Sequence, residues 1–259
     1  MARSRKTSNG NIGVGMSAKQ MRRKKPINSD LMVDISPLTD NQKIFFDEYK
    51  KGKNVFAYGA AGTGKTFVGL YLALKDVLDD RTPYEKVYIV RSLVATREIG
   101  FLPGDHEDKS SLYQIPYKNM CKYMFEMPSD ADFEMLYGNL KAQETIPFWS
   151  TSFIRGMSFD DAIIIVDEMQ NMTFEEIDTV MTRVGYRSKI IWCGDYRQTD
   201  LNKKKNDVSG ILKFFDIAYH MHAFTKIEFT VDDIVRSSLV KDYILAKLRY
   251  EDSIPTHST

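Results

Sequence analysis

The chain has 259 residues, of which 43% are hydrophobic and 27% charged, with a formal net charge of +1. This is the composition of a globular protein long enough to bury a full core, most simply as one large domain or one domain with appendages. No run of 18 apolar residues occurs, so a transmembrane helix is not expected, and the first residues lack the apolar segment of a secretory signal.

Residues 1–30 are predicted to be a flexible basic arm. Residues 1–29 contain eight Lys or Arg and no Asp or Glu, which leaves 28 basic and 35 acidic residues in the rest, a net of −7. Bulk charge therefore gives no argument for nucleic-acid binding, and a local basic surface or this arm would have to supply one. The arm is expected either to solubilise the protein or to bind a polyanion.

A helix is predicted to begin within residues 36–49, where Thr39 or Asp40 can cap it. Its apolar face is expected to consist of Ile44, Phe45 and Tyr49. A short apolar strand follows at residues 54–58, and residues 67–78 are expected to form a second helix because their apolar residues recur at three- and four-residue spacing.

The octet GAAGTGKT, residues 59–66, lies between that strand and that helix and has the spacing of a phosphate-binding P-loop. A strand before the loop and a helix after it would point the unpaired N–H groups and the positive end of the helix dipole at a bound phosphate. Lys65 is expected to supply charge to the outer phosphates, and Thr66 a hydroxyl to magnesium. The alternative is a glycine-rich turn that ends in a surface lysine.

Upstream of the loop, Gln42 is a candidate for reading the base, because a glutamine amide can bond to the N6 and N7 edge of adenine. Tyr49 or Tyr58 could stack on the base, although a core position is the commoner role of such residues. The predicted nucleotide-binding residues are Gln42, Gly59, Ala60, Ala61, Gly62, Thr63, Gly64, Lys65 and Thr66.

Further along the chain, strands and helices are predicted to alternate. Strands are expected at residues 86–90, 149–157, 162–166, 189–193 and 224–231, with a long polar and aromatic insertion at 101–147 and a helix at 211–220. Another helix should open with a capping box at Thr173 and Glu176, with its apolar face formed by Ile177, Val180, Met181 and Val184, and end at Gly185. This alternation predicts an α/β fold with a mostly parallel sheet flanked by helices.

Ligands of such sheets bind beyond the carboxyl ends of the strands, so the residues that follow each apolar run are candidates for chemistry. Asp167 and Glu168 follow the strand at 162–166 and fit a Walker B pair, in which Asp167 holds magnesium through water and Glu168 accepts a proton from the attacking water. Seen alone, the pair could also be a helix cap. Gln198, after the next strand, is interpreted as a phosphate sensor or as a plain turn residue.

Cys121 and Cys193 have no metal-like spacing to each other or to the four histidines. They favour a reducing, cytoplasmic setting, in which both would be small buried apolar side chains.

Five motifs in a fixed order resemble the PhoH family of predicted ATPases. They are GAAGTGKT at 59–66, FLPGD at 101–105, FIRGMSFDDAIIIVDEMQNMT at 153–173, TRVGYRSKIIWCGDYRQTDL at 182–201 and DDIVRSSLV at 232–240. The resemblance spans roughly residues 38–248. As a short member of the family, the chain is similar to the PhoH-like proteins of phages. A phage-encoded protein of this kind would be located in the host cytoplasm. The stretch ATREIG before FLPGD departs from the lysine-containing stretch of other members, and a nuclease activity like that of some cellular relatives is not expected.

The resemblance implies a RecA-like P-loop NTPase fold akin to a single motor lobe of superfamily one helicases, spanning residues 31–259. It also implies ATP with magnesium as ligands and action on RNA or single-stranded DNA. Arg91, Ser92 and Arg155 become candidates to contact nucleic acid or to couple it to the nucleotide, and Arg236 becomes the candidate arginine finger. Lys65, Glu168, Gln198 and Arg236 are thus the predicted catalytic residues.

A single motor lobe is expected to offer only one wall to its nucleotide, which favours a homo-oligomer, such as a hexameric ring, that presents Arg236 to a neighbour. Two other functions stay open: a P-loop kinase acting on a nucleoside or small molecule, and a nucleic-acid-binding scaffold with ATP as a structural ligand. A GTPase is disfavoured because residues 202–205, NKKK, lack the aspartate of the guanine-reading signal. The insertion's aromatic residues could stack bases, or form a subdomain core or an oligomer contact; they include Tyr113, Tyr117, Tyr123 and Phe125.

Overall fold

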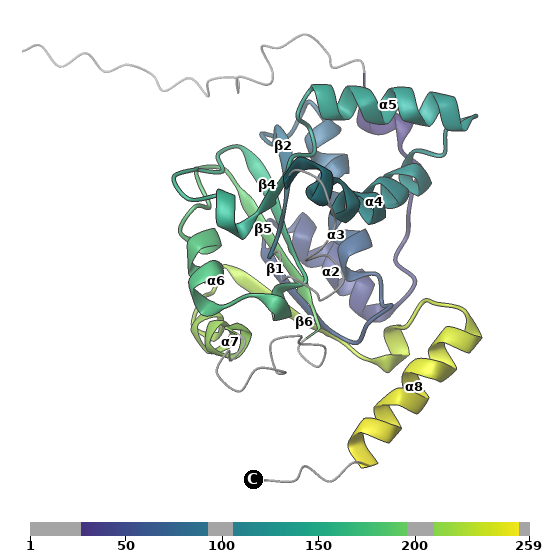
Figure 1. The fold of residues 1–259 in the computed structure, drawn as a ribbon, viewed down its shortest axis with the longest axis vertical. Coiled ribbons are helices and arrows are strands. Elements are labelled where there is room, and N and C mark those ends of the chain that lie inside the picture. Colours follow the sequence, from purple (N-terminus) through teal and green to yellow (C-terminus); the bar gives the residue numbers. More distant parts are fainter. Residues whose placement is uncertain (1–26, 93–105, 196–209, 254–259) are drawn as a thin grey trace, which may run out of the picture.

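A computed structural model describes residues 27–92, 106–195 and 210–253, and its centre is a six-stranded sheet (Figure 1). The strands are β1 (Asn54–Gly59), β2 (Lys86–Arg91), β3 (Phe148–Ser150), β4 (Ala162–Asp167), β5 (Lys189–Gly194) and β6 (Phe224–Phe229). Their order is β3-β2-β4-β5-β1-β6, and every neighbouring pair is parallel. The predicted α/β fold with a parallel sheet is confirmed.

The central strands are apolar because both of their faces are covered. All six residues of β4 are buried, as expected for a parallel sheet between two helical layers. The P-loop follows β1, the acidic pair lies at the end of β4, and β5 lies between these two strands. This is the RecA-like P-loop arrangement, and it brings the carboxyl ends of β1, β4 and β5 to one edge of the sheet.

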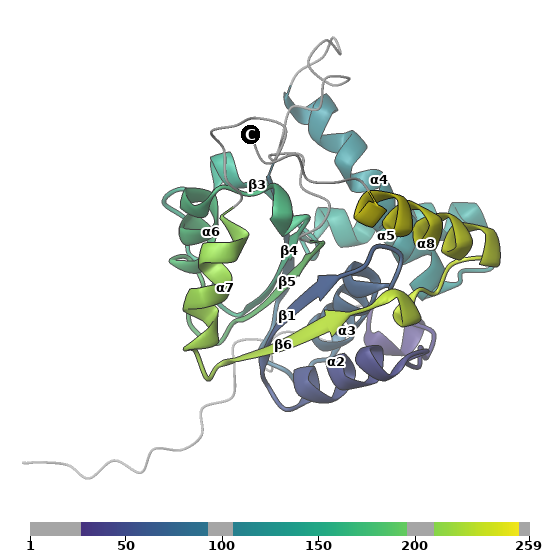
Figure 2. The ribbon, with the colours of Figure 1, turned by 90° about the horizontal axis from the view of Figure 1, so that it is seen from below.

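Helices form a layer on each face (Figure 2). One layer contains α2 (Asp40–Lys50), α3 (Lys65–Leu78), α4 (His106–Phe125) and α5 (Asp130–Ala142), whose buried side chains share one apolar cluster. The other contains α6 (Phe174–Met181) and α7 (Ile211–Tyr219), with a second cluster built around Phe56, Trp192 and Phe214. The described residues also form short 3-10 helices: η1 (Ser29–Leu31), η2 (Thr151–Phe153), η3 (Met169–Asn171) and η5 (Val231–Asp233).

Several local predictions are confirmed. The Thr39 hydroxyl accepts from the Gln42 N–H and caps α2. Thr173 and Glu176 form the predicted capping box of α6. Both cysteines are free and buried.

Other local predictions are wrong in detail. Ile44 is 44% exposed, and Phe46 occupies the apolar face of α2 instead. The predicted strand at 149–157 is only the three-residue β3, followed by η2, and the last strand ends at Phe229. Helix α6 ends at Met181 rather than at Gly185. Gly185 instead fits a close approach, because a Cβ there would lie 2.1 Å from Asp160 Oδ1.

The described part of the insertion, residues 106–147, forms α4 and α5, whose buried side chains pack in the same apolar cluster as those of α2 and α3. Tyr117 and Phe125 are buried in the same apolar cluster as α3, so the core interpretation holds for these two side chains. Tyr123 is 68% exposed and its ring packs on Phe67 of α3. The insertion is thus packed directly on the helix that follows the P-loop.

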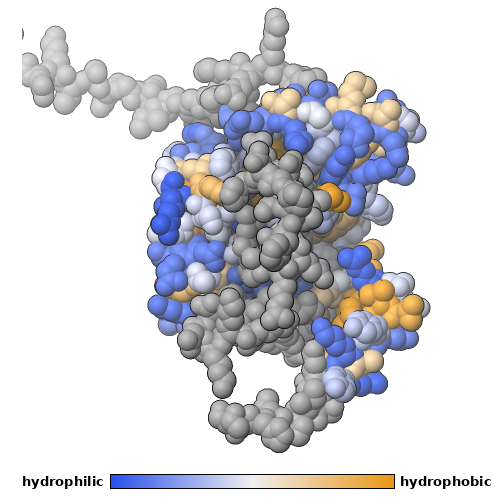
Figure 3. Space-filling model, viewed as in Figure 1, coloured by the Kyte–Doolittle hydropathy of each residue, from blue (hydrophilic) through white to orange (hydrophobic). Residues whose placement is uncertain are grey.

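The C-terminal helix α8 (Ser238–Ser253) follows η5 and lies apart from the two helical layers (Figure 1). Apolar side chains reach the surface in this region (Figure 3), among them Leu239, which is 77% exposed, and Val240. Within the described residues, no helix is long and apolar enough to cross a membrane.

Candidate nucleotide site

The carboxyl edge of β1, β4 and β5 holds a cleft of about 230 Å³. The P-loop forms its floor, and Asp167, Glu168 and Asp195 line it from the two other strands. Two further lining residues come from elsewhere in the chain: Met120 from α4, and Arg236 from the segment after η5. The sheet therefore gathers the predicted loop, acidic pair and arginine in one place.

The P-loop backbone requires glycine at both ends. Gly59 has φ +113°, and a Cβ there would lie 2.1 Å from the carbonyl oxygen of Phe229 on β6. The next N–H, that of Ala60, donates to that same oxygen at 2.8 Å. Gly64 has φ +81° and forms the N-cap of α3, so the free N–H groups of the first helical turn open toward the loop.

Gln42 supports the loop from the side of α2. Its Nε2 donates to the Thr63 carbonyl at 2.9 Å, and its Oε1 accepts from the Leu38 N–H at 2.8 Å. Both ends of the amide are thus engaged with backbone, in a side chain that is 4% exposed. In this arrangement Gln42 links the loop to the segment before α2, beside the place where a base would lie.

Lys65 is folded back onto the loop. Its Nζ donates to the carbonyls of Gly59 at 3.0 Å and Ala60 at 2.6 Å, and to Thr63 Oγ1 at 3.2 Å. Burial lowers the pKa of Lys65, while neighbouring acidic groups oppose that shift. The three donors of the ammonium are satisfied within the loop, so the cation is held where an anion on the loop would meet it.

Thr66 and Asp167 meet as the paired motifs predict. The Thr66 hydroxyl donates to Asp167 Oδ1 at 2.7 Å. The second carboxylate oxygen, Oδ2, accepts from the hydroxyl of Tyr117 at 2.6 Å. Burial and the adjacent Asp167 raise the pKa of Tyr117 well above its usual range, so this phenol stays protonated and acts as a donor.

Glu168 lies next to this carboxylate in a left-handed backbone conformation with φ +53°. Burial, with a further contribution from Asp167, raises the pKa of Glu168, and Arg91 acts in the opposite sense. Gln170 Nε2 donates to the Glu168 carboxylate, while Gln170 Oε1 accepts from the Asp195 N–H at 3.0 Å. Gln170 therefore ties Glu168 to the end of β5 and fixes its orientation.

The Thr66 hydroxyl and the Asp167 carboxylate are suitable ligands for a magnesium ion. Among the described residues, no three His, Cys, Asp or Glu side chains gather as a metal cage. Magnesium is typically held by one or two carboxylates together with substrate phosphates and waters, and a hydroxyl next to a carboxylate at the phosphate loop meets that requirement. Thr66 and Asp167 are the residues that would hold it.

A second cleft, of about 330 Å³, continues from the loop toward α2 and α4. Gln42, Phe67 and Val68 line it together with Val235 and Tyr123, among others. Its position and mixed apolar lining would suit a base. We call it the base cleft, and we call the cleft over the P-loop the phosphate cleft. Tyr49 and Tyr58 line neither cleft: Tyr49 donates to Asp76 at 2.8 Å, and the Tyr58 ring lies 4.6 Å from that of Phe215.

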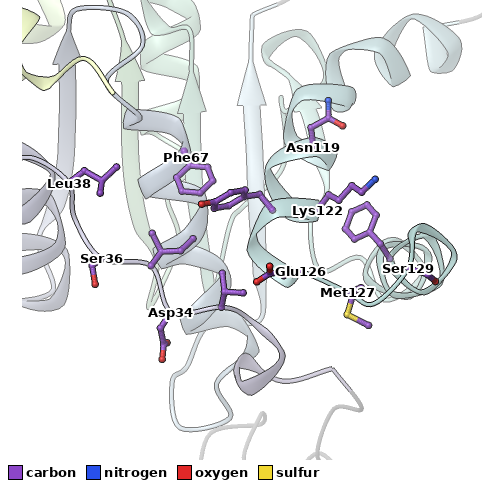
Figure 4. A pocket seen from close by; sticks show the side chains of 13 residues that line it. Asp34, Ser36, Leu38, Phe67, Asn119, Lys122, Glu126, Met127 and Ser129 are labelled. Carbon is purple, nitrogen blue, oxygen red and sulfur yellow. The ribbon is translucent and has the colours of Figure 1, made fainter. Parts of the chain in front are cut away.

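Beyond Phe67 and Tyr123 the base cleft borders a larger groove of about 940 Å³ (Figure 4). The segment 33–38 forms one side of this groove, and α4 and the start of α5 form the other. Phe67 from α3 points into it between the two sides. Helix α4 therefore runs past the phosphate cleft, the base cleft and this groove in turn.

Arg236 lies on the P-loop of its own chain. A Cβ at Gly62 would be 3.0 Å from the Arg236 Cγ, and the preceding Val235 N–H donates to the Gly62 carbonyl at 3.1 Å. Arg236 is thus held on its own P-loop, and its expected contact with a neighbouring subunit stays a prediction. Met120 and Tyr123 of α4 also line the two clefts, so side chains from outside the P-loop and the strand ends border them.

The other candidate residues are placed differently. Arg91, at the end of β2, lies over the ring of Tyr113 at 5.3 Å, and the Ser92 hydroxyl donates to Glu176 at 2.8 Å. Arg155 is exposed in the loop after η2. Gln198 falls outside the described residues, as do the FLPGD motif and the stretch before it.

Sequence reasoning missed two residues that shape the site. The sequence predicts only a base-stacking or core role for Tyr117, because no local pattern links it to Asp167, which is 50 positions away. Gln170 could have been found, because it is the third residue after Asp167 and belongs to the polar run that follows a buried strand.

The sequence is similar over most of its length to known proteins. A family model described as PhoH-like protein matches residues 34–247. A PhoH-like protein of Mycobacterium leprae (strain TN) is 31% identical over 219 residues, which are 84% of this chain and 60% of that protein. Protein PhoH of Escherichia coli (strain K12) is 26% identical over 210 residues, 80% of this chain and 57% of that protein. The chain thus spans about three fifths of the length of the curated relatives it matches.

Among solved structures, unliganded Pif1 from Bacteroides sp is 17% identical, with a TM-score of 0.38 over 85% of this chain and 47% of that chain. Bacteroides Pif1 bound to ssDNA is 15% identical, with a TM-score of 0.32 over 76% of this chain and 42% of that chain. Scores of this size transfer no residue roles, and the assignment of the site rests on its own geometry.

Proposed function

The chain belongs to the PhoH-like protein family, and from this premise we propose that its P-loop NTPase domain binds ATP with magnesium and hydrolyses it. The contact between Thr66 Oγ1 and Asp167 Oδ1, 2.7 Å long, is the observation that carries the proposal. It joins the end of the phosphate loop to the acidic pair, 101 positions apart in the sequence. A glycine-rich turn without a nucleotide role would not require this convergence.

In the proposed reaction, the loop amides and Lys65 bind the phosphates. Thr66 and Asp167 would hold magnesium, which would neutralise charge on the phosphates. Glu168 orients a water and takes its proton, and its raised pKa suits a base that must accept one. Asp195 and Gln170 keep Glu168 in place through the hydrogen bonds at the end of β5.

Arg236 is proposed to stabilise the charge that develops on the transferred phosphoryl group, and to do so within its own chain. Its side chain lies against Gly62, and it lines the same cleft as Lys65 and Glu168. Hydrogen bonds from Ala60 to Phe229 and from Val235 to Gly62 hold the segment after β6 on the loop. A ring of subunits is then not needed to complete the site, although self-association stays a separate question.

We also propose that hydrolysis is coupled to RNA or single-stranded DNA, as a helicase-like remodelling activity. The support is family membership together with Arg155, which is exposed in the loop after η2. Arg91 is better suited to the nucleotide side, because its charge acts on Glu168. The basic residues of the first 29 positions offer a second contact for a polyanion.

The test is phosphate release from ATP by the purified chain, with and without magnesium, and then with single-stranded RNA, single-stranded DNA or duplex. We expect release that needs magnesium and rises with a single strand, and a stimulation that weakens as salt rises because phosphate contacts release counterions. Tight ATP binding without release would favour the scaffold function. Equal rates with and without every nucleic acid would contradict the coupling but not the ATPase.

A further inference from the structure

Three side chains of α4 follow one another at three-residue spacing along the nucleotide clefts. Tyr117 donates to Asp167, Met120 lines the phosphate cleft, and Tyr123 lines the base cleft. Residues three apart on a helix share a face, so these contacts belong to one stripe. The stripe follows the same path from metal carboxylate to base that a bound nucleotide would follow.

We propose that α4 of the insertion is the second wall of the nucleotide site and that Tyr117 is a positioning residue for Asp167. The inference rests on the proposed function, since it assigns these residues to the same ATP and magnesium. The inference goes beyond that function because it gives the insertion a role. The insertion positions the Asp167 carboxylate for magnesium through the hydroxyl of Tyr117.

The hydrogen bonds on Asp167 explain why that phenol matters. Each carboxylate oxygen has its own hydroxyl donor, Thr66 on Oδ1 and Tyr117 on Oδ2. The Thr66 hydroxyl donates its one proton to Asp167, so its oxygen could coordinate a metal through a lone pair. The bond from Tyr117 is short, at 2.6 Å, and charge-assisted. Together with the bond from Thr66, it opposes rotation of the carboxylate about its Cβ–Cγ bond. The carboxylate plane is thus set before the metal arrives.

A merely structural role for Tyr117 is the competing explanation. The side chain is 2% exposed, and its ring lies 5.3 Å from that of Phe148, so it contributes to the core in any case. The ring and the hydroxyl can be separated, because Tyr117→Phe keeps the packing and removes only the donor. A structural role predicts a loss of stability alone, whereas a positioning role predicts a change in magnesium dependence.

The test measures binding of a fluorescent ATP analogue to the full chain, first in EDTA and then across a MgCl₂ titration. For Tyr117→Phe we expect unchanged affinity in EDTA and about a tenfold higher magnesium concentration at half-saturation, the usual scale for losing a partner that orients a metal ligand. Tyr137→Phe is the matched control: it removes a buried phenol hydroxyl of the insertion that has no hydrogen-bond partner among the described residues. It should leave both quantities unchanged.

A second variant tests the wall without risk to the core. Tyr123 is 68% exposed, so Tyr123→Ala should fold normally, yet lower the affinity for the analogue about tenfold in EDTA and in magnesium alike, as expected for the loss of an aromatic contact to a base. Unchanged affinity would remove α4 from the base side.

Failure of this inference can be told from failure of the proposed function. An unsubstituted chain that binds no analogue in any condition contradicts the function itself. The other outcome is an unsubstituted chain that binds the analogue in a magnesium-dependent way, with a Tyr117→Phe variant whose half-saturating magnesium concentration lies within twofold of that of the parent. This outcome overturns only the role of Tyr117.

Discussion

The P-loop and helix α4 border the same cleft, but they are built on opposite principles. The loop is eight consecutive residues whose amides and glycines do the work, and its own contacts are local: Lys65 bonds to Gly59 and Ala60, six and five positions away. Helix α4 has no motif and reaches the site through side chains alone, with Tyr117 bonding to Asp167 across 50 positions.

This difference between the P-loop and α4 indicates where the cleft tolerates amino-acid substitution. A backbone-built cradle depends on conformations that only glycine adopts without cost, as at Gly59 with φ +113°. A wall built of side chains depends on individual functional groups, so single atoms can be removed from it and their effects measured. The expected effects therefore run from near-complete loss at the loop to small changes in the insertion.

The largest effect is expected at Arg236, which lies against the loop. Arg236→Ala should lower ATP turnover by about a thousandfold, because an arginine that stabilises the phosphoryl charge is worth at least that much. Arg236→Lys should recover little, since a point charge does not reproduce the guanidinium geometry. The measurement is steady-state phosphate release at saturating ATP and magnesium.

A mixing experiment separates action within one chain from action on a neighbour. Equal amounts of Arg236→Ala and Glu168→Gln protein are combined. If the arginine served a neighbouring subunit, mixed assemblies would contain intact sites and turnover would partly return. The geometry at Gly62 predicts no recovery, and recovery would show that the arginine acts between subunits.

The next effect is expected at Glu168. Glu168→Gln should lower turnover by roughly a hundredfold or more, which is the usual worth of a positioned general base, while ATP affinity stays near that of the parent. The substitution keeps an oxygen that can accept from Gln170, so its structure should persist. Turnover that survives in this variant would remove Glu168 from the chemistry and reopen the kinase alternative.

Acidity should act through the same residue. The pKa of Glu168 in the folded chain is raised above its ordinary value of 4.5, so the carboxylate needed for hydrolysis is present above that raised value and is lost as pH falls through it. The acid limb of turnover should thus lie above pH 4.5 and fall about tenfold per pH unit. A limb at or below the ordinary glutamate pKa would contradict a buried base.

The raised pKa of Glu168 affects turnover and stability in opposite directions, because the ionised carboxylate that hydrolysis needs also destabilises the folded chain. A carboxyl with a raised folded pKa contributes stability that is fully present below its unfolded pKa and is lost as pH rises through the folded value. Glu168→Gln removes this loss, so the variant should melt at a higher temperature than the parent at pH 7. The gain should vanish near pH 4.

The smallest effect is expected in the insertion, away from the stripe on α4. Tyr137→Phe removes a buried hydroxyl that has no partner among the described residues, so the free energy of unfolding should change by less than about 1 kcal/mol and in the stabilising direction. Chemical denaturation of the two proteins measures it. A marked loss of stability would show that this hydroxyl has an unrecognised partner.

The parts of the fold that the sequence predicts are those with local causes. Apolar strands, the Thr39 cap and the Thr173 capping box follow from neighbouring residues and appear as expected. The parallel sheet then places Thr66 beside Asp167 without further information, since both follow from strand ends on one edge. Glycine proved ambiguous: Gly185 looked like a helix end, but it is required by close packing on Asp160.

The rest of the site depends on packing between distant segments. Nothing near Tyr117 in the sequence distinguishes a core tyrosine from one that donates to Asp167, and only the docking of α4 on α3 decides between them. The same holds for Arg236, whose position on Gly62 results from the pairing of β6 with β1. The lining of the clefts by Met120 and Tyr123 of the insertion likewise depends on this packing, and the sequence gives no local sign of it.

The central claim is that a triphosphate binds where Lys65 and Asp167 converge. Calorimetric titration of ATP with magnesium into the parent and into Lys65→Ala tests it most directly, with the melting temperature of each variant as the check on folding. We predict micromolar-range binding by the parent, on the scale usual for enzyme substrates, and a loss of about a hundredfold or more in the variant. A folded Lys65→Ala protein that binds and cleaves ATP as well as the parent would contradict the account.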